Sequence, residues 1–231
     1  AHNNLGSALM DLGRLEDAVA TYGKALAIKP DYANAHNNLG NALGKLGKLE
    51  EAVTSYRKAL TLTPDYPEAH YNLGNALRGL GKLDRAVNSF QEALRLNPSF
   101  AEAHNKLGSG LQELGRWEEA IASYHKVLAL KPDNADTHNN LGVALSCLGR
   151  WSDSLEHYQK AHDLMPTLPL LHANLGYAFN ALKRREEAHH HFAENMRLNT
   201  AKKQSHVFDR SSSSIYKSKI KHDIEQFKYL G

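Results

Sequence analysis

Apolar residues recur along the chain with the spacing of an α-helix, and the whole pattern repeats every 34 residues. In residues 35–68, Leu39 and Leu43 lie four positions apart, and Val53 and Tyr56 lie three positions apart further along. Such intervals place side chains on one face of a helix. Each 34-residue unit is therefore predicted to contain two amphipathic helices.

Six such units follow one another without insertion or deletion. We number them 1 to 6, and they span residues 1–34, 35–68, 69–102, 103–136, 137–170 and 171–204. Self-similarity at a fixed period is typical of a solenoid, in which each unit packs only on its neighbours. The chain is therefore predicted to be an all-α solenoid whose helix-turn-helix units fill residues 1–200.

Glycine and proline mark the helix ends within each unit. Gly47 lies where the first helix of unit 2 must stop, because glycine readily adopts the left-handed conformation found there. Pro64 closes the second helix of the same unit. The equivalent glycines are Gly13, Gly81, Gly115 and Gly149, and the equivalent prolines are Pro30, Pro98, Pro132 and Pro166.

Small residues fall where the two helices of a unit must touch. Gly40 and Ala42 on the first helix, with Ala52 and Ala59 on the second, leave room that Tyr56 fills. The succession of Leu-Gly, Ala, Tyr or Phe, Ala and Pro resembles the tetratricopeptide repeat family, over about 200 of the 231 residues. The resemblance implies a right-handed superhelix with the first helices on its concave side.

Unit 6 departs from the pattern in a way that suggests the end of the array. Lys183 replaces the turn glycine and Thr200 replaces the closing proline. Residues 201–214 are expected to form a polar linker, and 213–230 a helix that caps the apolar face of unit 6. Two alternatives remain open for this helix, namely that it lies in the concave groove or that it begins a connection to another domain.

Composition narrows the functional classes. The formal net charge of +3 arises mainly from residues 201–231, so the units themselves are nearly neutral and binding to nucleic acid is not expected. No apolar run is long enough to span a membrane. A single Cys147 is compatible with a reducing compartment, which predicts a cytoplasmic protein. Because Ala1 begins in repeat register without an initiator Met, we expect the chain to be a piece of a longer protein.

The face of the first helices that is expected to line the concave groove is rich in amides. An asparagine side chain offers a donor and an acceptor, so it can hold a peptide bond without reading sequence. Flat aromatic rings can add anchoring contacts, although they can also be ordinary surface residues. The candidate partner-binding residues are Asn3, Asn4, Asn37, Asn38, Asn41, Lys45, Tyr71, Asn72, Asn75, Asn105, Lys106, Asn139, Asn140, Asn174 and Tyr177.

One column of these amides has a known counterpart. It consists of Asn4, Asn38, Asn72, Asn140 and Asn174, interrupted by Lys106. This column is similar to the asparagine ladder in the repeat arm of O-linked N-acetylglucosamine transferases, where the resemblance implies binding of extended substrate backbone. The alternative is a structural role in packing between turns. If the column binds peptide, replacing Asn38, Asn72 and Asn140 by Ala should weaken binding and leave stability nearly unchanged.

No pattern indicates catalysis, a cofactor or a metal. The stretch from Gly40 to Lys45 lacks the spacing of a phosphate loop and lies within a helix. Repeat-column histidines such as His36 are expected to be half-buried with one ring nitrogen bonded locally. If these rings are held neutral, the stack should lose stability below about pH 6. Consecutive His189, His190 and His191 point in different directions and cannot converge on one ion.

The sequence therefore favours a non-enzymatic interaction scaffold that binds a protein or peptide ligand in its concave groove. A second hypothesis is that the array is the substrate-recruiting arm of a larger enzyme, such as a glycosyltransferase, sulfotransferase or oxygenase. The predicted groove has no cationic set that would clamp a terminal carboxylate as the chaperone-binding branch of the family does. The open apolar face of unit 1 also predicts some end-to-end self-association.

Overall fold

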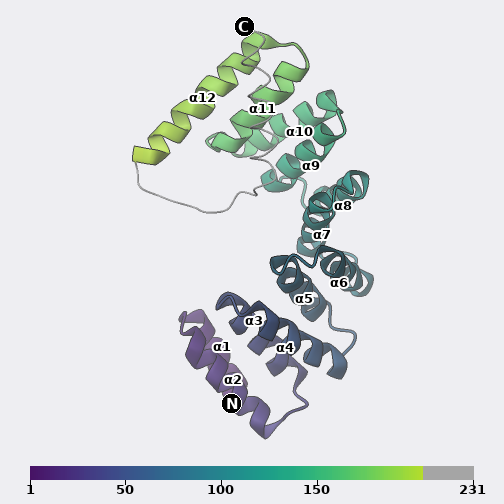
Figure 1. Ribbon diagram of the computed structural model, residues 1–231, viewed down its shortest axis with the longest axis vertical. Coiled ribbons are helices and arrows are strands. Elements are labelled where there is room, and N and C mark those ends of the chain that lie inside the picture. Colours follow the sequence, from purple (N-terminus) through teal and green to yellow (C-terminus); the bar gives the residue numbers. More distant parts are fainter. Residues whose placement is uncertain (205–231) are drawn as a thin grey trace.

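The computed structural model describes residues 1–204, which form twelve α-helices arranged in six antiparallel pairs (Figure 1). Within this described part there is no strand. The first helices of the six units are α1 (His2–Asp11), α3 (Ala33–Lys45), α5 (Pro67–Gly79), α7 (Ala101–Glu113), α9 (Ala135–Cys147) and α11 (Pro169–Ala181). The second helices are α2 (Leu15–Ile28), α4 (Leu49–Leu62), α6 (Leu83–Leu96), α8 (Trp117–Leu130), α10 (Trp151–Leu164) and α12 (Arg185–Gln204). The predicted all-α solenoid is confirmed.

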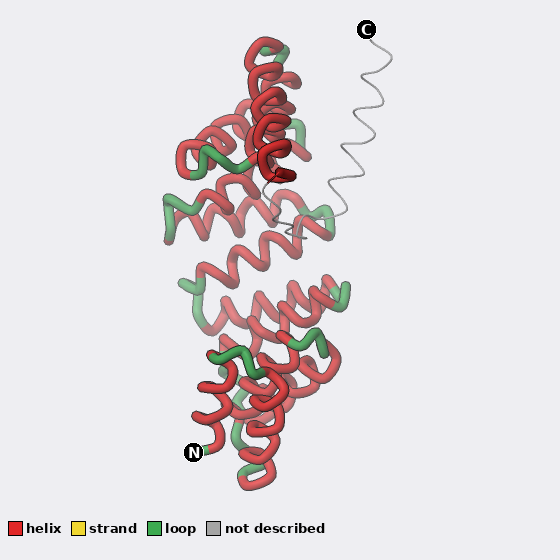
Figure 2. Tube along the Cα trace, turned by 90° about the vertical axis from the view of Figure 1, so that its left-hand side faces the viewer, coloured by secondary structure: helices red, strands yellow, loops and turns green. Residues whose placement is uncertain are grey.

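Successive pairs stack in chain order from one end of the molecule to the other, as Figures 1 and 2 show. Each second helix packs on the first helix of its own unit, and the second helices of units 1 to 5 also pack on the first helix of the next unit. Consecutive first helices also touch one another, whereas no contact joins consecutive second helices in residues 1–204. The stack is therefore tighter on the side of the first helices, and we call this side the inner wall.

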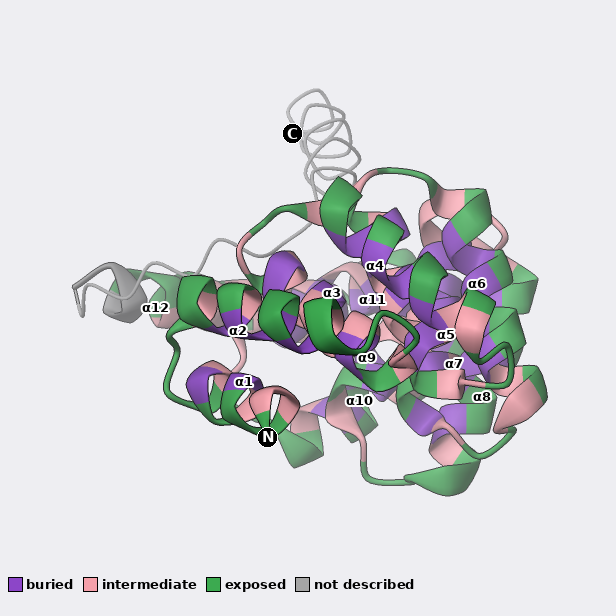
Figure 3. Ribbon diagram, turned by 90° about the horizontal axis from the view of Figure 1, so that it is seen from below, coloured by how far each residue is buried: buried purple, intermediate pink, exposed green. Residues whose placement is uncertain are grey.

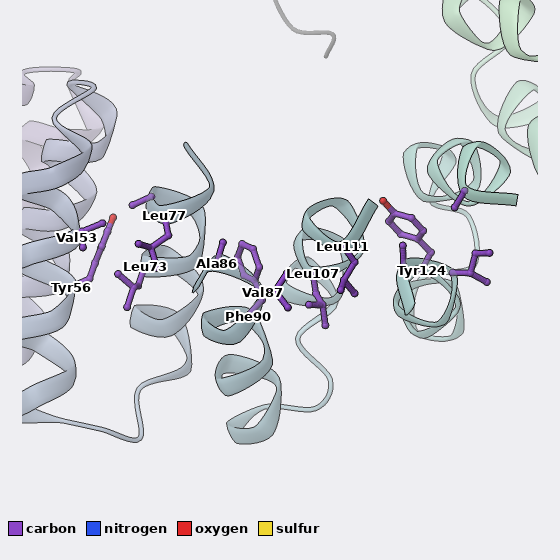
Figure 4. Close-up of a cluster of buried hydrophobic side chains, with 14 of the residues drawn as sticks. Val53, Tyr56, Leu73, Leu77, Ala86, Val87, Phe90, Leu107, Leu111 and Tyr124 are labelled. Carbon is purple, nitrogen blue, oxygen red and sulfur yellow. The ribbon is translucent and has the colours of Figure 1, made fainter. Parts of the chain in front are cut away.

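The apolar faces predicted from the sequence form one continuous core between the helices. Figure 3 shows buried segments on the helix faces that meet neighbouring helices, and exposed segments outside them. Side chains of successive units interleave along the stack, among them Tyr56, Leu77, Phe90 and Leu111 (Figure 4). Phe90 has no solvent exposure at all. Burial of these rings and methyl groups is the main force that holds the units together.

The close approach within each pair depends on the first-helix glycine. A Cβ atom built on Gly74 would lie 2.6 Å from Cε1 of Phe90. The same overlap occurs between Gly40 and Tyr56, and in the other four units. The aromatic ring thus occupies the space that a larger residue at the glycine would need.

The turn inside each unit is closed by backbone geometry. Gly47 has a φ of 77°, and the N–H of Lys48 donates to the carbonyl of Leu43 at 2.9 Å. The glycines of units 1 and 3 to 5 also have positive φ. Lys183 holds the same place in unit 6 with a φ of 61°, and it is the sole described residue other than glycine in this region.

Helix α12 extends to Gln204, so residues 201–204 are helical and the expected start of the polar linker is wrong. The physical reason is Thr200, which permits a helix to continue where proline ends the second helices of the other units. The rest of the linker and the expected capping helix at 213–230 lie outside the described residues. None of the described helices is long and apolar enough to cross a membrane.

Candidate functional site on the inner wall

The predicted wall residues differ widely in their exposure. Asn4 and Lys45 are exposed, whereas three of the asparagines are buried, with exposed fractions of 4% for Asn37, 9% for Asn139 and 2% for Asn174. The other candidates are partly exposed, and these are Asn3, Asn38, Asn41, Tyr71, Asn72, Asn75, Asn105, Lys106, Asn140 and Tyr177. The burial of Asn37 corrects the expectation that its side chain is turned away from packed surfaces.

Three hydrogen bonds between asparagines explain this burial. In each, the third residue of one unit accepts at Oδ1 from Nδ2 of the fourth residue of the next unit. We call each such bond a rung. The rungs are Asn38 to Asn3 at 3.2 Å, Asn72 to Asn37 at 3.1 Å, and Asn174 to Asn139 at 2.7 Å. These asparagine pairs thus form a structural seam between consecutive first helices.

A second layer of polar contacts lies further along the same helices, toward their C-terminal ends. The buried Tyr56 hydroxyl donates to Oδ1 of Asn41 at 2.8 Å. In unit 4 the Tyr124 hydroxyl donates to Oε1 of Gln112 at 3.2 Å, and burial raises the pKa of Tyr124 to about 12. Each hydroxyl therefore stays protonated at neutral pH and fixes an amide on the wall. Gln112 was missed from the sequence because it lies outside the asparagine columns.

The rung pattern is interrupted between units 3 and 4. Tyr71 stands at the acceptor position and Lys106 at the donor position. The Tyr71 ring packs on two phenylalanines, with centroids 4.9 Å from Phe100 and 6.0 Å from Phe90. Both aromatic candidates are therefore partly engaged in packing, since Tyr177 similarly meets Phe192 at 5.2 Å.

The interruption carries the main charges of the central wall. Arg78 and Glu113 form a half-buried ion pair of 2.8 Å between units 3 and 4. Burial, and secondly the positive charge of Arg78, lower the pKa of Lys106. The next pair, Asn105 and Asn140, forms no rung, and Oδ1 of Asn105 is buried without a hydrogen bond.

The histidines of the column hydrogen-bond locally as the sequence suggests, but His138 and His172 are buried rather than half-buried, with exposed fractions of 8% and 4%. In five units the ring Nε2 lies 2.9–3.1 Å from the carbonyl oxygen of the proline six residues earlier, as for His36 and Pro30. A carbonyl only accepts, so Nε2 carries hydrogen and Nδ1 is an acceptor in the neutral ring. Within residues 1–204 no group of three or more His, Cys, Asp or Glu side chains is arranged to hold a metal ion.

Units 5 and 6 add a second histidine to this column. Nδ1 of His157 lies 3.1 Å from Nδ1 of His138, and Nδ1 of His191 lies 3.0 Å from Nδ1 of His172. The added histidines replace small hydroxyl residues that are buried in the second helices of units 1 to 4, namely Thr21, Ser55, Ser89 and Ser123. Sequence reasoning missed these pairs, although the change at one repeat position marks them.

Comparison with known families identifies the class. Sequence profiles described as TPR repeat match residues 6–47, 41–81 and 111–146, and profiles described as tetratricopeptide repeat match 67–100 and 135–168. Together they cover more than half of the chain. The chain therefore belongs to the tetratricopeptide repeat family.

Solved structures share the fold. The chain is similar to "MamA 41-end from Desulfovibrio magneticus RS-1", with 28% identity, a TM-score of 0.70, and coverage of 73% of this chain and 96% of that one. It is also similar to YrrB, titled "a TPR protein with an unusual peptide-binding site", with 29% identity, a TM-score of 0.67, and coverage of 79% and 90%. Pseudomonas aeruginosa PilF, at 20% identity, a TM-score of 0.74, and coverage of 86% and 90%, shows the fold alone. The comparison with curated proteins finds no significant match.

Proposed function

We propose that the protein is an interaction scaffold whose inner wall binds an extended peptide segment of a partner, largely through the peptide backbone. The observation that carries this proposal is the repeated, partly exposed amide at the fourth residue of the units. Asn38, Asn72 and Asn140 present it from three first helices of one stack.

The rungs prepare these amides for binding. Asn38 uses one N–H for its rung to Asn3, which leaves its second N–H and its Oδ1 for a ligand. Asn72 is held in the same way by Asn37. A side chain that is already fixed loses little entropy when a ligand binds, so a rung increases the affinity that its amide can provide.

The peptide-binding site of YrrB supports the same class of ligand for this chain. Exposed carboxylates and cations occur together on the first helices, including Lys45, Glu68 and Asp136, so a uniformly charged partner is not favoured. Such binding would serve an isolated scaffold or the recruiting arm of a larger enzyme equally well. The complete reading frame distinguishes these two settings.

Substitution of Asn140 gives the clearest test, because this partly exposed amide forms no rung. A library of random linear peptides is first selected on the wild-type protein, and the affinity of the selected peptides is then measured for Asn140→Ala. Loss of an amide that makes two hydrogen bonds to a peptide bond should weaken binding about tenfold. The melting temperature should change little.

The matched control is Asn174→Ala, which removes the buried 2.7 Å rung to Asn139. Here the free energy of unfolding should fall by about 1–3 kcal/mol, since the Asn139 amide is left without its partner. If the library yields no binder, or if Asn140→Ala binds every selected peptide as tightly as the wild type does, the proposed function is wrong.

A further inference from the structure

The interruption of the ladder between units 3 and 4 is a coordinated change. At this place the acceptor amide is replaced by Tyr71 and the donor amide by Lys106. A tyrosine side chain has no amide oxygen to accept a rung, and the Tyr71 ring packs on Phe100. An asparagine at position 106 would therefore have no partner for a rung, and the wall here carries a cation in its place.

Lys106 is a charge without a counter-charge. The nearby carboxylate of Glu113 is paired with Arg78, whose Nε lies 2.8 Å from Oε1 of Glu113. No carboxylate of the described residues lies within 4.0 Å of the Lys106 amine. The three side chains together therefore carry one net positive charge on the inner wall.

This arrangement is costly in the free protein. The Lys106 side chain is half-buried, and its ammonium loses part of its hydration while Arg78 repels it. An unpaired cation in such surroundings gains most from an anion that approaches from the open side.

We propose that Lys106 is a specificity-determining residue that selects an aspartate or glutamate side chain at one register of the bound peptide, opposite unit 4. This inference rests on the proposed peptide binding and adds sequence selectivity to it. The amides of units 2, 3 and 5 hold the backbone irrespective of sequence, and Lys106 fixes which residue lies at the centre of the wall. The selected partner has a single acidic side chain there, since exposed acidic groups such as Glu68 and Asp136 occur on the neighbouring first helices α5 and α9.

The test uses random linear peptides selected in parallel on the wild-type protein, on Lys106→Gln and on Lys106→Arg. Peptides selected on the wild type and on Lys106→Arg should carry Asp or Glu at one fixed position of the aligned peptide sequences. Peptides selected on Lys106→Gln should show no such preference. When that acidic residue is changed to its amide in a selected peptide, affinity for the wild type should fall about tenfold and affinity for Lys106→Gln should be unchanged.

Lys58→Gln is the control, because Lys58 is an exposed cation on the second helix α4, outside the inner wall and outside the candidate binding residues. It should keep the acidic preference of the wild type. Selection of tight binders without an acidic position would overturn the role of Lys106 and leave the proposed function intact. A failure to select any binder would refute the proposed function itself, and an acidic preference that persists in Lys106→Gln would assign the selectivity to another residue.

Discussion

Lys183 adopts a backbone conformation that glycine takes at the equivalent turn of the other five units. A residue with a Cβ atom is strained in the left-handed region by about 1–2 kcal/mol. Lys183→Gly should therefore raise the free energy of unfolding by about 1 kcal/mol, measured by urea denaturation. The reciprocal change Gly149→Lys introduces the same strain into unit 5 and should lower it by a similar amount. A Lys183→Gly variant with a lower free energy of unfolding than the wild type would show that the lysine side chain makes a stabilising contact.

Neighbouring asparagines show what single residues reveal about the site. Asn37 and Asn38 are adjacent and chemically identical, yet the first is buried and the second is partly exposed. Their directions differ by about 100° on the helix, and the rung that buries Asn37 comes from Asn72 in the next unit. The sequence predicts that both lie on first helices, but the contact between units decides which one can meet a ligand.

At the scale of the helix pair, the glycine and the aromatic ring act as one packing element. A methyl group on Gly74 would lie 2.6–3.0 Å from three carbon atoms of the buried Phe90 ring. Gly74→Ala should therefore lower the free energy of unfolding by about 1–3 kcal/mol despite the better helix propensity of alanine. Differential scanning calorimetry of the purified variant measures this effect.

Gly23 provides the control, because it lies inside α2 and a Cβ atom there would meet nothing within 4 Å. Gly23→Ala should be stabilising by about 0.5–1 kcal/mol through helix propensity alone. If both variants shift the melting temperature in the same direction, the close approach of Gly74 to Phe90 does not govern the stability of the pair.

Helix elements were predictable to the extent that each unit encodes them locally. The turn glycines and closing prolines give the helix limits of units 1 to 5, because these residues act on their own backbone. The end of α12 was not predictable in this way, since Thr200 neither stops nor requires a helix. The exposure of the wall residues could not be predicted from the sequence either, because it depends on contacts between units.

At the scale of the whole molecule, the stack is uniform in shape but uneven in its titratable groups. Burial, followed by the charges of His172, His190 and His162, lowers the pKa of His191 to about 4. Burial and the neighbouring His138 also lower the pKa of His157. Acidic groups of the same helix oppose these shifts, namely Glu187 for His191, and Glu156 and Asp153 for His157.

Units 5 and 6 should therefore open first when the pH falls. The pKa of His191 in the folded state is below its usual value of 6.5, so between these two pKa values the unfolded chain binds more protons than the folded chain. The stability contributed by neutral His191 is therefore complete above about pH 6.5 and is lost as the pH falls toward 4. Hydrogen exchange between pH 7 and pH 4.5 should show a loss of protection in α9 to α12 before α3 to α8. The control is the double variant His157→Ser with His191→Ser. It gives units 5 and 6 the serine that unit 2 has at this position, Ser55, whose hydroxyl donates to the carbonyl of Glu51. This double variant should lose protection at the same pH along the whole stack, and a wild-type pH profile in the variant would refute the role of the paired histidines.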